Sequence, residues 1–208
     1  MTSPEPESGA SRDELLQRIA LVETMIAEGR RSTARCGWIF VLWGLVDIAG
    51  VGWEKVQSNF NWIWPITLAT GLAIQFLVMA LRGGAGTVGR RSVQNRNIAA
   101  VWSMMGLTVI LYVFAGLFQH KAWQISYIVA ILMFVGMAHA ISALILRWPV
   151  QGAVAVLWWA GGIGMYFIGG DYFLAIFVAE MFFGMVLFGL YAMWLDGRER
   201  QGRANANG

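Results

Sequence analysis

The sequence predicts an all-α, polytopic membrane protein with six transmembrane helices and both termini in the cytoplasm. Apolar residues make up 58% of the 208 residues and charged residues only 13%, whereas ordinary soluble domains are roughly 25% charged. Six apolar runs are each long enough to cross a bilayer, which takes roughly 18 residues or more. They form one transmembrane domain at 36–195, with spans at 36–53, 62–81, 98–118, 122–146, 149–168 and 172–195.

The basic residues predict the orientation of these spans. Every arginine falls on one side of the inferred bilayer, and both lysines, Lys55 and Lys121, fall on the other. Positive charge is retained on the cytoplasmic side, so both termini are expected there. The short loops favour a prokaryotic inner membrane. Six arginines are expected to set this topology and to contact anionic lipid headgroups, namely Arg30, Arg31, Arg35, Arg90, Arg91 and Arg96.

Two polar segments flank the spans. Residues 1–10 lack apolar periodicity and predict a disordered tail, and 196–208 predicts a short cytoplasmic tail. Between 11 and 29, Ser11 and Glu14 match a capping box and Gly29 matches a C-terminal stop, which indicates a short amphipathic cytoplasmic helix. Its apolar stripe consists of Leu15, Ile19, Val22 and Ile26.

Two interpretations of this amphipathic helix compete. It can lie on the membrane surface, or its stripe can pair with another helix in a short coiled coil. A surface helix usually has a basic polar face, but acidic residues outnumber Arg12 and Arg18 here. The charges therefore favour contact with a second subunit, in a homo-oligomer, or with the protein's own loops.

Four polar side chains inside the apolar runs are candidates for an ion or proton pathway. They are Asp47, Glu180, His139 and Gln75. A charged side chain at mid-bilayer costs about 3 kcal/mol on insertion scales, so such residues often mark a pathway or a binding site. Helix rise places Asp47 and Glu180 at similar depths, where they can share a proton or a cation if their helices are neighbours. The competing interpretation is that each group simply hydrogen-bonds a neighbouring helix.

The composition argues against several chemistries. Only two histidines and one cysteine, Cys36, are present, so no histidine-rich or cysteine-rich metal centre is expected within one chain. No cofactor and no nucleic-acid partner are expected either.

Three function classes remain. The first is a small channel or transporter, cation- or proton-coupled through Asp47 and Glu180. The second is a non-catalytic regulator or scaffold that binds a cytoplasmic protein through the N-terminal helix and the arginine-rich face. The third, an enzyme acting on lipid through Asp47, Glu180 and Asp171, is disfavoured because no nucleophile motif accompanies these acids.

Overall fold

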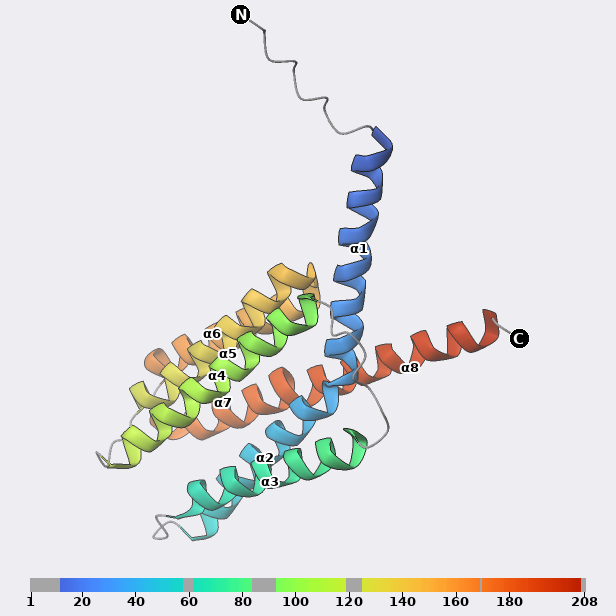
Figure 1. Ribbon diagram of the computed structural model, residues 1–208. Helices are drawn as coiled ribbons and strands as arrows, with labels where there is room; N and C mark the ends of the chain where they lie inside the picture. The colour runs from blue at the N-terminus through green and yellow to red at the C-terminus, as the bar shows by residue number, and fades with distance from the viewer. Residues whose placement is uncertain (1–11, 58–61, 84–92, 119–124, 169, 207–208) are drawn as a thin grey trace, which may run out of the picture.

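The computed structural model describes residues 12–57, 62–83, 93–118, 125–168 and 170–206, and every regular element in these ranges is a helix (Figure 1). Six of its helical stretches are long and apolar enough to cross a membrane. The elements are α1 (Arg12–Arg35), α2 (Gly37–Val56), α3 (Ile63–Gly83), α4 (Val93–Phe118), α5 (Ile125–Leu146), α6 (Pro149–Ile168), η1 (Gly170–Tyr172), α7 (Phe173–Glu180), the π-helix η2 (Met181–Leu187) and α8 (Phe188–Ala206).

The helices form two groups joined by the C-terminal stretch. Helices α2 and α3 make an antiparallel pair, and α4, α5 and α6 make a second group (Figure 1). The α7–η2–α8 stretch packs against α2 on one side and α6 on the other. The core lies in the second group and along this stretch, with Leu132, Leu146, Trp158 and Met165 fully buried. Large apolar side chains cover the outward faces, as expected of helices that meet hydrocarbon.

Helix α1 is longer than the sequence predicts. It runs to Arg35 and does not stop at Gly29, which is buried. Thr33 donates a hydrogen bond to the Gly29 carbonyl at 3.1 Å, and Thr33 and Ala34 are buried. Helix α1 packs against α4, α5 and α8, and this packing stabilises it beyond the glycine where a stop was expected. The N-terminal half of α1 is exposed and projects away from the bundle (Figure 1).

The C-terminal segment, expected as a short polar tail, is helical as far as the structure describes it. Helix α8 continues through the predicted tail at 196–208 as far as Ala206. Two ion pairs join this part of α8 to α1: Arg31 with Glu199 at 2.8 Å and Arg35 with Asp196 at 3.6 Å. Within α8, Asp196 also pairs with Arg200 at 2.5 Å.

The arginines expected at lipid headgroups therefore have protein partners as well. Arg30 donates through Nε to the Leu146 carbonyl at 2.6 Å and through a second nitrogen to the Arg147 carbonyl. This contact caps the end of α5, where Arg147 has a φ of 48°. Arg96 is exposed on α4. Arg90 and Arg91, like residues 1–10, lie outside the described residues.

Candidate functional site

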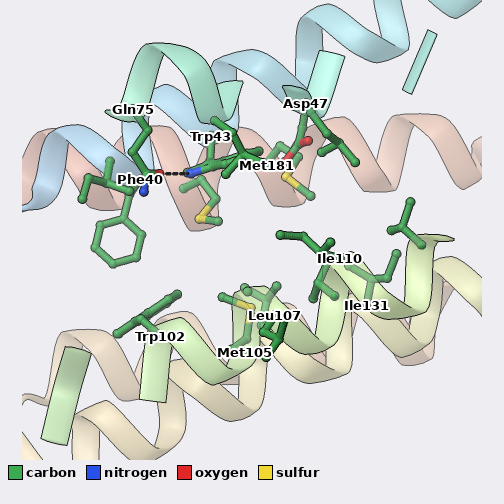
Figure 2. Close-up of a pocket in the computed structure, with 18 of the residues that line it drawn as sticks. Phe40, Trp43, Asp47, Gln75, Trp102, Met105, Leu107, Ile110, Ile131 and Met181 are labelled. Carbon is green, nitrogen blue, oxygen red and sulfur yellow. Dashed lines mark hydrogen bonds between the residues drawn. The ribbon is translucent and has the colours of Figure 1, made fainter. Parts of the chain in front are cut away.

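A cavity of about 780 Å³ separates the two groups of helices. Helices α2 and α3 line one side of it, α4 and α5 line the other, and α7 and η2 contribute five residues, among them Phe177 and Met181. It runs along the helices from Thr33 and Cys36 near the α1 end to Glu54 near the opposite end. In Figure 2, Trp43 and Asp47 lie across the gap from Trp102 and Ile110. The cavity has the size of a typical site for a small organic molecule, roughly 300–1,000 Å³.

Polar groups in this cavity are few, and two of them are carboxyls. Asp47 lies on the cavity wall formed by α2, and it forms no hydrogen bond or ion pair with any residue in the described ranges. Glu54 accepts a hydrogen bond from Trp64 Nε1 at 3.2 Å. Gln75, on α3, accepts one from Trp43 Nε1 at 2.7 Å (Figure 2). No described residue of the lining is basic, so its ionisable groups are carboxyls together with the thiol of Cys36.

Two of the four predicted pathway residues, Asp47 and Gln75, line this cavity. The other two, Glu180 and His139, lie elsewhere, although the helices of Asp47 and Glu180 are neighbours because α2 packs against α7 and η2. Met181 faces the cavity, whereas Glu180, one residue earlier, is buried against Gly161 of α6. Neighbouring residues on a helix point in different directions. The expected sharing of a proton between Asp47 and Glu180 therefore lacks direct contact in this structure.

Glu180 belongs to a second group of polar side chains, which is buried in the core. Glu180 is 4% exposed, and His139, Gln151 and Trp158 are fully buried. Within the described part of the chain, Glu180 Oε2, both nitrogens of His139, both polar atoms of Gln151 and Trp158 Nε1 have no hydrogen-bond partner. Buried polar atoms without partners are rare in proteins and often mark a site that takes up water or a proton.

Helix α6 contributes two members of this buried polar group. Gln151 and Trp158 are two helical turns apart, on the same face of α6. His139 of α5 stacks at 6.4 Å, measured between ring centroids, on Trp158. The Trp158 indole nitrogen lies against Gly184 of η2, where the absence of a Cβ leaves room for the ring. The group therefore extends along α6 toward Gly161 and the carboxyl of Glu180.

A π-helix lies between the cavity and the buried polar group. η2 begins at Met181, directly after Glu180. Two of its residues, Met181 and Met185, line the cavity, and a third, Gly184, contacts Trp158. π-helical turns are rare and are frequent at functional sites.

Sequence reasoning did not single out Gln151 or the π-helix. Gln151 is the third residue of α6, and in the sequence a polar residue so near the end of a span is ordinary. In the structure, packing of α6 against α5 buries it.

The chain matches no protein-family model, no curated protein and no solved structure.

Proposed function

We propose that the protein is a small membrane transporter or channel in which Asp47 binds a cation or a proton. One observation carries the proposal: Asp47 lies, without a protein partner among the described residues, on the wall of a cavity of about 780 Å³ that no described basic side chain lines. A carboxyl among apolar helices is costly, and function is the usual reason for keeping it. Most of the chain lies in the apolar helices, which favours a role within the bilayer.

The proposal includes the membrane and the orientation. Six apolar helices suit a multi-pass protein of the inner membrane. Helices α1 and α8 meet at one end of the bundle, where Arg30, Arg31 and Arg35 gather, and this end is cytoplasmic by the positive-inside rule. Anionic headgroups at that surface are the lipid partners of the exposed arginines.

The buried polar group has a separate role in this proposal. Glu180, His139 and Gln151 have unpaired polar atoms along α6. We propose that these groups, when hydrated, pass protons to one another, and η2 joins them to the cavity wall through Met181, the residue after Glu180. Gln75 supplies a polar group to the cavity wall, where it accepts a hydrogen bond from Trp43.

Ion flux in proteoliposomes tests this function. Replacing Asp47 with Asn keeps the shape of the side chain but removes its charge, so we expect flux of protons or monovalent cations to fall about tenfold or more. Glu28→Gln is the matched control, because it removes one carboxylate from the exposed face of α1, outside the cavity. Wild-type flux in folded Asp47→Asn protein would contradict the proposal.

The second candidate function is a membrane scaffold. It is favoured by the apolar stripe of α1, where Leu15, Ile19 and Val22 are 50%, 55% and 50% exposed. A pull-down of cytoplasmic protein that is lost on deletion of residues 1–28, in a protein without measurable flux, would favour this function over transport.

A further inference from the structure

The chemistry of the cavity lining indicates what kind of molecule fits there. Most of the lining is aliphatic, such as Leu68, Ile110 and Val135. Its acidic side chains are Asp47 and Glu54, and no arginine, lysine or histidine is found in the described lining. Such a cavity repels anions. Few oxygen atoms line the cavity to replace the hydration shell of an inorganic cation, so the lining favours a proton or an organic cation over an inorganic one.

Aromatic rings add a second preference. The lining includes Phe40, Trp43, Trp64, Trp102, Phe173 and Phe177. Aromatic faces attract organic cations, and this attraction is strongest where water is excluded. A cavity that combines these rings with a carboxyl on the same wall favours a cation with an apolar exterior over a neutral molecule of the same size.

Hydrogen bonds and ring contacts hold these aromatics in place. Trp43 Nε1 donates to Gln75, Trp64 Nε1 to Glu54, and Trp102 Nε1 to Ser142 Oγ at 3.1 Å. Phe40 packs edge to face on Trp102 at 4.8 Å between centroids, and Trp64 packs in the same way on Phe177 at 6.3 Å. The N–H group of each indole is thus hydrogen-bonded to another side chain, and a ligand in the cavity does not have to accept a hydrogen bond from it.

From these features we infer that the cavity binds an apolar organic cation, such as an alkylated or aromatic ammonium or phosphonium ion, with Asp47 as its counter-ion. This inference rests on the proposed transport function and specifies its substrate class. A neutral acyl chain would fill the same volume but would leave Asp47 without a partner, and that is costly in an apolar cavity. An organic cation satisfies the carboxyl and loses little hydration on entry.

Two probes of equal shape and opposite charge test the inference. Tetraphenylphosphonium and tetraphenylborate differ mainly in the sign of their charge. We expect saturable binding of the phosphonium to the full chain in uncharged-lipid nanodiscs, measured by equilibrium dialysis, and at least tenfold weaker binding of the borate. Asp47→Asn should weaken phosphonium binding about tenfold or more. Glu28→Gln, which removes an exposed carboxylate from α1, should leave it unchanged.

Two results would overturn the inference. One is equal binding of both probes, and the other is wild-type phosphonium affinity in Asp47→Asn. If Asp47→Asn does not fold, Glu54→Gln takes its place and should weaken phosphonium binding in the same direction. Its failure to do so would also count against the inference.

The proposed function is tested separately. Inorganic ion flux without phosphonium binding would refute only the substrate class, and phosphonium binding without any flux would refute only transport.

Discussion

At the scale of single residues, Gly161 determines how Glu180 is accommodated. A Cβ at Gly161 would overlap the Glu180 carboxyl group, whereas a Cβ at Gly164, one turn further along α6, would meet nothing within 4 Å. Overpacking a core typically costs about 1–3 kcal/mol. We therefore expect Gly161→Ala to lower the thermal unfolding temperature in detergent and Gly164→Ala to leave it close to wild type.

A double variant separates crowding from a general effect of helix composition. Glu180→Ala removes the overlapping group, so adding Gly161→Ala to it should cost much less than Gly161→Ala alone. Equal unfolding temperatures for the Gly161→Ala and Gly164→Ala proteins would contradict the close packing of Glu180 on α6.

Sequence reasoning identified some of the polar residues but not how they are grouped. Asp47, Gln75, His139 and Glu180 stand out because a polar side chain is conspicuous in an apolar run. Which of them meet depends on helix rotation. Apolar side chains surround α4 and α5 on all sides, so periodicity does not indicate which face of either helix is buried. The separation of Glu180 from the cavity of Asp47 could therefore not be predicted.

At the scale of helices, the exposed half of α1 predicts self-association. In a heptad pattern, Leu15, Ile19, Val22 and Ile26 occupy the core positions, with Arg18 at g and Glu23 at e. A parallel pair places Arg18 of one copy opposite Glu23 of the other. Arg18 also bonds Glu14 within its own helix at 2.6 Å. Two copies inserted in the same orientation present α1 in parallel, and their membrane anchorage raises the effective concentration.

Disulfide cross-linking measures this pairing. In a Cys36→Ser background, Val22→Cys places thiols at facing core positions of a parallel pair, so we expect oxidation to yield a covalent dimer. Leu21→Cys is the control, because Leu21 is 62% exposed but lies off the stripe. Equal cross-linking at 21 and 22, or none at 22, would show that the stripe does not form a parallel pair.

Element boundaries show which signals are local and which are tertiary. The start of α6 at Pro149 matches the predicted span, because proline at the first turn is a local signal. The ends of α1 and α8 differ from expectation because ion pairs between the two helices, such as Arg31 with Glu199, stabilise segments that are polar by composition. The π-helix after Glu180 has no sequence signature comparable to a proline or a cap.

At the scale of the whole molecule, the charge distribution and the helix directions agree with each other. Successive membrane-length helices run in opposite directions, so that Arg30, Arg35 and Arg147 lie at the same end of the bundle. Lys55 and Gln57 lie at the end of α2 that is remote from α1. Two orientations in the membrane remain, and we propose the one that the positive-inside rule favours, with the arginine-rich end in the cytoplasm.

Labelling in intact bacteria tests that choice. With Cys36 replaced by serine, Gln57→Cys should react with a membrane-impermeant maleimide from outside the cell, because Gln57 is exposed at the end remote from the arginines. Glu28→Cys, exposed on α1, should react only after the membrane is permeabilised. The reverse pattern would place the arginine-rich end outside. In that case α1 could not meet a cytoplasmic partner, and the end of the cavity lined by Glu54 would face the cytoplasm.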